Sequence, residues 1–194
     1  MLLDAMWNEV ADRLEGRLVT LERLGRHHAD ALRTAGADPL VWRWMIVDNV
    51  DEWLESSFDE PGRIAYATLV RGVPSGSTSF LGLAPEHRRL EIGATWLAPS
   101  AWRTGANAEA KLLMLRHAFE DLGCLRVEFK TDALNEQTRR ALEALPSRFE
   151  GVHRKHMLVR GGERRDSAWY SILDDEWPQV RANLERRLIG RAVA

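Results

Sequence analysis

The sequence predicts a single α/β domain in which a mixed β-sheet is covered by helices. Two kinds of segment indicate this: short stretches in which apolar and polar residues alternate, and longer stretches in which apolar residues recur every three to four positions. A junction at residues 96–109 joins the two kinds, with a strand before it and a helix after it. At 194 residues the chain has the length of one domain with a full core. We therefore expect one domain over residues 1–194.

Charge and cysteine content exclude several classes of function. The net charge is −2 with acidic and basic residues interspersed, so no basic field is available to hold a nucleic acid. The single cysteine, Cys124, cannot form an internal disulfide, and no metal-ligand spacing surrounds it. The chain has no basic, apolar leader and no run of about 18 apolar residues. We therefore expect a cytoplasmic protein without a metal, a nucleic acid or a membrane as partner.

The N-terminal half predicts two helices and a β-hairpin. We expect one helical turn at Trp7, and a capping box of Asn49 and Glu52 that opens the second helix. Alternating residues on both sides of Arg71-Gly72 predict the hairpin. In order, the predicted elements are a lead-in over residues 1–15, a strand over 17–21, a helix over 27–35 closed by Gly36, a helix after Asn49, and hairpin strands over 64–70 and 75–83.

The strand over residues 88–97 carries a candidate catalytic carboxylate. Successive side chains of a strand point to opposite faces. Glu91 is therefore expected on the same face as Gly93 and Thr95, where small residues leave space for a ligand. Strict alternation places Leu90, Ile92, Ala94 and Trp96 on one face, and Glu91, Gly93, Thr95 and Leu97 on the other.

The segment after this strand predicts a turn that can hold an anion. Pro99 ends the strand, and Gly105 lets the backbone turn into a helix over residues 106–122. Backbone N–H groups at the start of a helix bind anions, although many such junctions only reverse the chain. The apolar stripe of this helix consists of Ala108, Leu112, Leu115, Phe119 and Leu122.

The last third predicts further strands and helices. Asn135 is placed to cap a helix, and Arg160-Gly161-Gly162 marks a turn between two strands. The predicted elements are a strand over residues 125–130, a helix over 135–145, strands over 149–159 and 167–173, and a terminal helix over 175–194.

The order of these motifs resembles the GNAT superfamily of N-acetyltransferases. The resemblance lies in a strand, the motif Trp-x-x-Gly-x-Asn-x-Glu-Ala that begins at Trp102, an amphipathic helix, and then residues 126–132 with Asn135. It extends over about residues 16–188 and implies a central, mostly antiparallel, twisted sheet flanked by helices. Later motifs are similar to the RimJ/RimL-like branch, which acetylates protein N-terminal amines or related amines: Phe149-Glu150-Gly151, Arg154-Lys155-His156, Arg165-Asp166, Tyr170-Ser171 and Glu176-Trp177.

The resemblance implies acetyl-CoA as co-substrate. A row of main-chain amides between Ala98 and Ala108 would bind its diphosphate, and strands splay near Leu97, whose backbone would meet the thioester carbonyl. The family loop usually begins with Gln or Arg and ends with Gly or Ala, whereas this chain has Trp102 and Asn107 there. The implied cofactor-binding residues are Leu97, Trp102, Arg103, Thr104, Gly105, Ala106, Asn107 and Asn135.

Acetyl transfer requires an uncharged amine, and Glu91 is the candidate base. A protein α-amine has a pKa of about 7.7–8.0 and needs modest help at neutral pH, unlike a lysine amine at about 10.4. Glu91 would take the proton through a water molecule. Equally, Glu91 could form a salt bridge with Arg88, Arg89 or a residue of the neighbouring strand. His87 and His156 are weaker candidates for the base.

A hydroxyl group is the candidate proton donor to the leaving thiolate. The RimJ/RimL-like pattern has Asn, two residues, then Ser, and the same spacing here implies this role for Thr138. Asn135 and Thr138 could instead form only a helix cap. Tyr170 is a second hydroxyl, or a core residue. Cys124 has no His partner nearby in sequence, which favours direct attack by the amine over a covalent enzyme intermediate.

Other features leave alternatives open. Trp42, Trp44 and their neighbours either pack helices on the sheet or, as in the family, line the mouth of an acceptor pocket. Pro146 stands where relatives usually carry a glycine, so the turn there is expected to differ. The acceptor is expected to be a protein N-terminal α-amine; a small amine and a non-catalytic CoA-binding protein are the alternatives. Dimers are frequent among relatives, so a homodimer is a further expectation.

Overall fold

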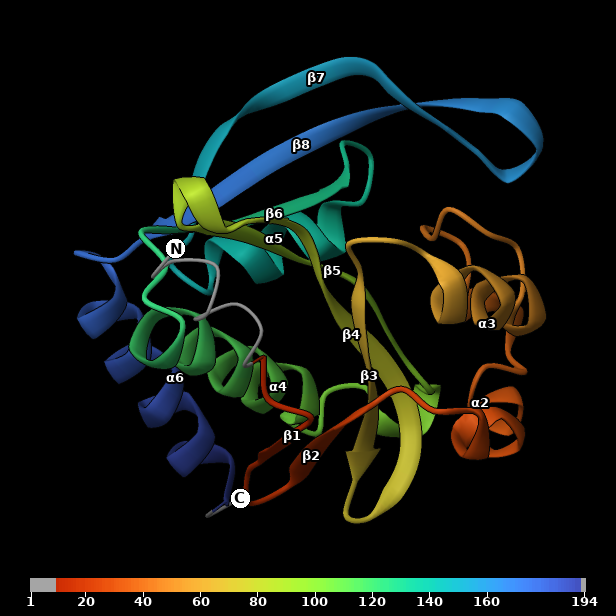
Figure 1. The fold of residues 1–194 in the computed structure, drawn as a ribbon, viewed down its shortest axis with the longest axis horizontal. Helices are drawn as coiled ribbons and strands as arrows, with labels where there is room; N and C mark the ends of the chain where they lie inside the picture. The colour runs from red at the N-terminus through yellow and green to blue at the C-terminus, as the bar shows by residue number, and fades with distance from the viewer. Residues whose placement is uncertain (1–9, 193–194) are drawn as a thin grey trace.

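The computed structural model describes residues 10–192, so the helical turn expected at Trp7 lies outside the described residues. Its centre is an eight-stranded sheet in the order β1-β2-β3-β4-β5-β6-β8-β7 (Figure 1). All neighbouring strands are antiparallel except β5 and β6, which are parallel. The strands are β1 (Arg13–Glu15), β2 (Val19–Arg23), β3 (Ile64–Val70), β4 (Val73–Ala84), β5 (Arg89–Leu97), β6 (Arg126–Asp132), β7 (Arg148–Val159) and β8 (Glu163–Leu173).

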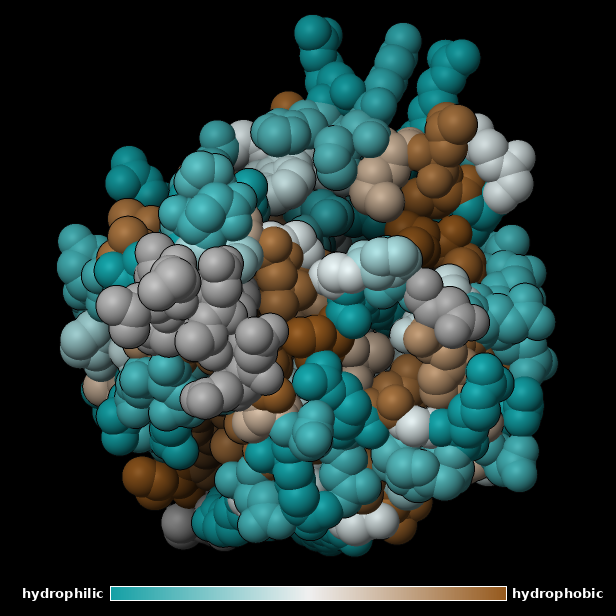
Figure 2. All heavy atoms as spheres, in the orientation of Figure 1, coloured by the Kyte–Doolittle hydropathy of each residue, from teal (hydrophilic) through white to brown (hydrophobic). Residues whose placement is uncertain are grey.

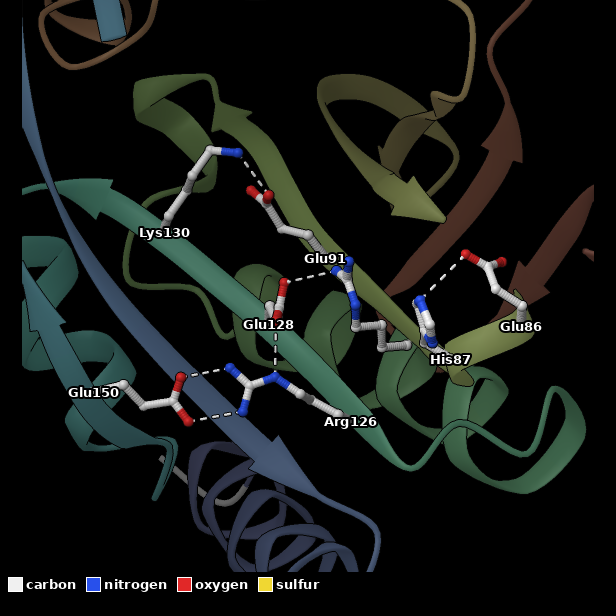
Figure 3. Close-up of polar contacts among 8 residues, drawn as sticks. Glu86, His87, Glu91, Arg126, Glu128, Lys130 and Glu150 are labelled. Carbon is white, nitrogen blue, oxygen red and sulfur yellow. Dashed lines mark hydrogen bonds and ion pairs between the residues drawn. The ribbon is translucent and has the colours of Figure 1, made fainter. Parts of the chain in front are cut away.

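Helices cover the two faces of the sheet unequally. One face packs against α4, α5 and α6, and the other packs against α2 and α3 near β3 and β4 (Figure 1). Among residues 10–192, no helix covers the charged part of β5, β6, β7 and β8 on this second face. We call this region the polar face, and it carries Glu91, Arg126, Glu128, Lys130 and Glu150 (Figure 3). The α-helices are α2 (Ala29–Ala35), α3 (Val50–Asp59), α4 (Ala106–Arg116), α5 (Glu136–Glu143) and α6 (Trp177–Ala192).

Most of the predicted elements are confirmed with small shifts of their ends. The capping residue Asn49 accepts a hydrogen bond from Glu52 N at 3.0 Å, and Gly36 ends α2. The short strand β1 was missed, and the strand predicted at 17–21 begins two residues later. After Arg116, α4 continues as π-helix over His117–Asp121, close to the predicted end. Within residues 10–192, no helix combines the length and the apolarity needed to span a bilayer.

A β-bulge in β5 overturns part of the predicted face assignment. Ser77 and Ser79 of β4 pair with Trp96 and Gly93, so β5 has one residue more than β4 over this stretch, and Ala94 has φ +47°. The bulge reverses the alternation. Trp96 therefore joins the cluster with α2 and α3, and Thr95 and Leu97 turn toward α4. The prediction holds for Glu91 and Gly93 and is wrong for the residues after the bulge.

Glu109 of α4 binds the turn between β1 and β2. Its carboxylate is buried and accepts hydrogen bonds from the backbone N–H groups of Arg17, Leu18 and Val19, at 2.6–3.1 Å. Gly16 permits this approach, because a Cβ there would lie 2.9 Å from the Glu109 side chain. The Glu of the Trp-x-x-Gly-x-Asn-x-Glu-Ala motif thus fixes the helix that follows the candidate anion-binding turn.

Candidate active site

The sheet opens between β5 and β6, beside Glu91. These strands are register partners only at Arg89–Glu91 of β5 and 126–128 of β6. Beyond Glu91, β5 continues through its bulge to Leu97, and in the described chain it pairs there with β4 alone. The strands therefore separate after Glu91, and β5 goes on without β6 toward the turn before α4.

Glu91 is buried on the polar face and forms an ion pair. It is 5% exposed, and its carboxylate accepts a hydrogen bond from Lys130 Nζ of β6 at 2.6 Å (Figure 3). Burial raises the pKa of Glu91, and the Lys130 ammonium acts in the opposite direction. A Cβ at Gly93 would lie 2.7 Å from Glu91 Oε1, so the glycine leaves room for the carboxylate. The expected salt bridge to a neighbouring strand is therefore present.

Paired charges continue from Glu91 across the polar face. Arg126 of β6 bonds Glu128 at 2.7 Å and pairs through two guanidinium nitrogens with Glu150 of β7 (Figure 3). The Arg126 hydrogen bond lowers the pKa of Glu150 to about 2. Arg126 thus pairs with both carboxylates, and all three side chains line one pocket. A pocket of about 330 Å³ is lined here by Arg89, Arg126, Glu128, Glu150, His153 and Trp169.

The turn before α4 has fewer available amides than the sequence predicts. The N–H groups of Ala98, Ala101 and Trp102 donate to carbonyls of Ser75, Ala98 and Pro99. The Ala106 N–H donates to Thr104 Oγ1 at 3.3 Å. Gly105 caps α4 with φ +98°, a conformation that favours glycine. The expected row of amides therefore shortens to the residues around Gly105 and the first turn of α4.

The two substituted positions of the turn do not fill it. Trp102 is 42% exposed and its indole Nε1 donates to the Leu97 carbonyl at 2.7 Å, so the ring lies back along the end of β5. Asn107 is exposed on the first turn of α4, and Arg103 and Thr104 are exposed beside it. Gly105 and Ala106 themselves are buried between these exposed positions.

Asn135 and Thr138 form the helix cap that was one of the two expectations. Asn135 is buried and its Oδ1 accepts a hydrogen bond from Thr138 N at 3.0 Å, at the start of α5. Thr138 itself is half-buried. Tyr170, the other candidate hydroxyl, is a core residue with no exposed surface, and its oxygen accepts a hydrogen bond from Arg139 Nε at 3.1 Å.

The remaining candidates have other partners or are chemically inert. His87 is exposed on a 3₁₀ turn before β5, next to Glu86 (Figure 3). His156 of β7 bonds Ser167 Oγ at 3.0 Å. Burial raises the pKa of Cys124 to about 12, which keeps the thiol protonated.

The tip of the β7–β8 hairpin meets the loop between α2 and α3 (Figure 1). Arg160 at the tip donates through Nη1 to the Met45 carbonyl at 2.5 Å, and its N–H donates to the Ile46 carbonyl at 3.2 Å. Hydrophobic side chains gather in this area of Figure 2, and Ile46 and Leu158 are exposed. Trp42 and Trp53 pack in the core against Trp96, as one of the two interpretations expected, whereas Trp44 is half-buried.

The sequence of this chain also matches a known family. Residues 18–146 match the family model described as Acetyltransferase (GNAT) domain. The chain belongs to this family. It is a GNAT N-acetyltransferase, and the mixed α/β sheet is the fold that the resemblance implied.

Three similar proteins show how much of the chain resembles other acetyltransferases. A crystal structure of a putative acetyltransferase from T. thermophilus is 43% identical, with a TM-score of 0.85 over 92% of this chain and 97% of that one. The putative ribosomal N-acetyltransferase YdaF of Bacillus subtilis is 29% identical over 168 residues, covering 86% of this chain and 87% of that protein. The uncharacterized N-acetyltransferase YoaA of the same species is 34% identical over 98 residues, half of this chain and 54% of its own length.

One buried lysine on the α4 face of the sheet was missed from the sequence. Lys111 of α4 is 8% exposed, and its Nζ donates to Thr95 Oγ1 at 2.8 Å and to Thr78 Oγ1 at 3.4 Å. Burial lowers the pKa of Lys111 to about 7. The signal was its position between Ala110 and Leu112, where an α4 residue turned toward the sheet cannot reach solvent.

Proposed function

We propose that this enzyme transfers the acetyl group of acetyl-CoA to the α-amine of a protein N-terminus. The observation that carries the proposal is the buried Glu91 carboxylate at the point where β5 and β6 separate. An α-amine with a pKa near 8 needs only a weak base, whereas a lysine amine needs a much stronger one. The similarity to YdaF, named as a putative ribosomal N-acetyltransferase, supports a protein acceptor.

Acetyl-CoA fits the turn and the gap that follow β5. The exposed Arg103, Thr104 and Asn107 surround the left-handed Gly105, and the start of α4 favours negative charge. The amides of Asn107 and Ala108, in the first turn of α4, have no carbonyl partner within the helix. In this proposal the turn from Trp102 to Asn107 holds the diphosphate, and Asn135 borders the thioester arm.

The reaction requires one proton acceptor and one proton donor. The amine nitrogen bonds to the thioester carbonyl carbon, the carbon–sulfur bond breaks, and the electron pair leaves with sulfur. Glu91 takes the amine proton through a water molecule, and the Lys130 ammonium keeps its carboxylate ionised beforehand. Thr138 gives a proton to the thiolate, and the Leu97 backbone stabilises the carbonyl oxygen. The proposal treats the chain as one domain in a reducing compartment, which its single buried cysteine fits.

Replacement of Glu91 tests this proposal. We expect Glu91→Gln to lower kcat/KM about 10²-fold to 10⁴-fold, because the amide cannot accept the proton. Thiol release from acetyl-CoA is measured with a panel of peptides that have free N-termini and with small amines. The dissociation constant for CoA, measured by calorimetry, is expected to stay unchanged.

Glu185→Gln is the matched control, since Glu185 pairs with Arg181 on the surface of α6. Its activity is expected to equal that of the wild type. Unchanged turnover in Glu91→Gln would remove Glu91 from the mechanism. Thiol release with small amines and with none of the peptides would overturn the choice of acceptor.

A further inference from the structure

Arg165 of β8 is a buried cation without a bonding partner. The residue is 7% exposed, and its Nε has no hydrogen-bond partner. Residues 10–192 provide its side chain with no hydrogen bond and no ion pair. By contrast, the Arg63 side chain, which is 3% exposed, donates to Ser79 Oγ and to Glu60, both at 3.0 Å, although its Nη2 also has no partner. A buried charge with no partner is costly, so Arg165 calls for an explanation.

Arg165 lies on the same face of the sheet as Glu91. Side chains alternate along β8, so Arg165 and Trp169 share a face, and Trp169 is the register partner of Lys130. The Lys130 ammonium in turn bonds Glu91. The indole Nε1 of Trp169 is also buried without a partner. Two unsatisfied donors therefore face the region next to the proposed base.

The carboxylates that act on Arg165 electrostatically each have another hydrogen-bond partner. Glu91 and Asp132 both act on the Arg165 guanidinium electrostatically. However, Glu91 is bonded to Lys130 at 2.6 Å, and Asp132 Oδ1 accepts a hydrogen bond from Leu134 N at 2.9 Å. The pKa of His156 is lowered by its burial and by the positive charges of Lys130, His153 and Arg165. Glu91 and Asp132 balance the charges of Lys130 and Arg165, but neither is hydrogen-bonded to the Arg165 guanidinium.

We propose that Arg165 binds a carboxylate of the acceptor, so that the enzyme selects N-terminal segments with an acidic residue near the amine. This inference rests on the proposed function, which places the amine at Glu91. Arg165 and Trp169 are four positions apart in β8, about 13 Å along a strand. An extended peptide advances about 3.3–3.6 Å per residue, and the two side chains shorten the distance to be bridged. The carboxylate is therefore expected at position 2, 3 or 4 of the acceptor.

Peptides with Asp at position 2, 3 or 4 test the proposal against peptides with Asn at the same position. We expect kcat/KM to be about 10-fold to 100-fold higher for one Asp peptide than for its Asn counterpart, because a carboxylate forms a charge-assisted pair with the guanidinium. Free aspartate and glutamate form a second arm, which identifies a small amine as the source of the carboxylate. Equal rates for Asp and Asn peptides would overturn the inference and leave the proposed function intact.

Three variants separate binding from a structural role. Arg165→Met is expected to abolish the preference for Asp and to raise the melting temperature of the free enzyme, because it removes an unpaired buried charge. Arg165→Lys is expected to restore part of the preference. Arg164→Gln, at the exposed neighbouring position, is the matched control and is expected to change neither quantity. A lower melting temperature of Arg165→Met with the preference retained would indicate a structural role and contradict the proposal.

Discussion

Lys111 and Lys130 lie on opposite faces of the same sheet and have different partners. Lys130 is on the polar face and has a carboxylate at 2.6 Å, so the ammonium is paired. Lys111 lies between the sheet and α4, where its nearest bonding partners are two threonine hydroxyls. Burial with only hydroxyl partners lowers the pKa of Lys111 to about 7, far from the usual range of a lysine.

The difference shows that buried charges are stabilised differently on the polar face and on the α4 face. On the polar face, carboxylates and guanidinium groups satisfy one another, as Arg126 and Glu150 do. On the α4 face, three backbone N–H groups satisfy the Glu109 carboxylate, whereas burial favours the uncharged form of Lys111. Arg165 departs from both patterns, which is why we assign it a ligand.

Glu109 provides the largest expected effect on the α4 face. Glu109→Ala leaves three backbone N–H groups unsatisfied, so we expect the free energy of unfolding to fall by about 3 kcal/mol or more. Urea denaturation measures it. The exposed control Glu136→Ala loses only a surface pair with Arg140 and is expected to change stability by less than about 0.5 kcal/mol. Similar losses in the two variants would mean that the α4 face places no special demand on a charge.

Lys111 provides a pH-dependent effect on the same face. Its pKa is near 7 in the folded protein and near 10.5 when exposed, so the unfolded chain binds more protons between these values. The wild type should therefore gain stability over Lys111→Met by about 1.4 kcal/mol per pH unit as the pH rises from 7 toward 10. Urea unfolding at pH 7, 8 and 9 measures this slope. A constant difference between the two proteins would show that Lys111 stays charged.

The pair of Arg126 and Glu150 on the polar face provides the smallest effect. Because the pKa of Glu150 is lowered from 4.5 to about 2, its stabilisation is present above pH 4.5 and is lost as the pH falls toward 2. The carboxylate is partly exposed, so Glu150→Gln is expected to cost less than about 1 kcal/mol at pH 7. Thermal unfolding of both proteins at pH 7 and pH 3 measures this. A cost above about 2 kcal/mol would mean that the polar face is as demanding as the α4 face.

Local patterns predicted the elements of the fold but not every direction of a side chain. Alternation located β5 and correctly placed Glu91 with Gly93. It failed at Thr95, because the extra residue of a bulge depends on pairing with β4, and β4 is more than ten residues away in sequence. The three-residue strand β1 was too short to produce a pattern.

The partners in the site depend on contacts that sequence spacing does not reveal. Glu91 meets Lys130 because β5 and β6 are neighbours in the sheet, although 39 residues separate them. The expected helix cap of Asn135 was local and was confirmed. Arg165 belongs to a strand that was predicted to begin at residue 167, so its burial was not foreseen.

The parallel contact between β5 and β6 joins two blocks of the sheet, one from β1 to β5 and one from β6 to β8, through three register pairs. Because so few residues pair, a change in the angle between the two blocks would break few backbone hydrogen bonds between β5 and β6. The distance between Glu91 on one block and Arg165 on the other would then vary with that angle. If Arg165 binds the acceptor as we propose, such a change of angle would let one enzyme hold acceptors of slightly different length.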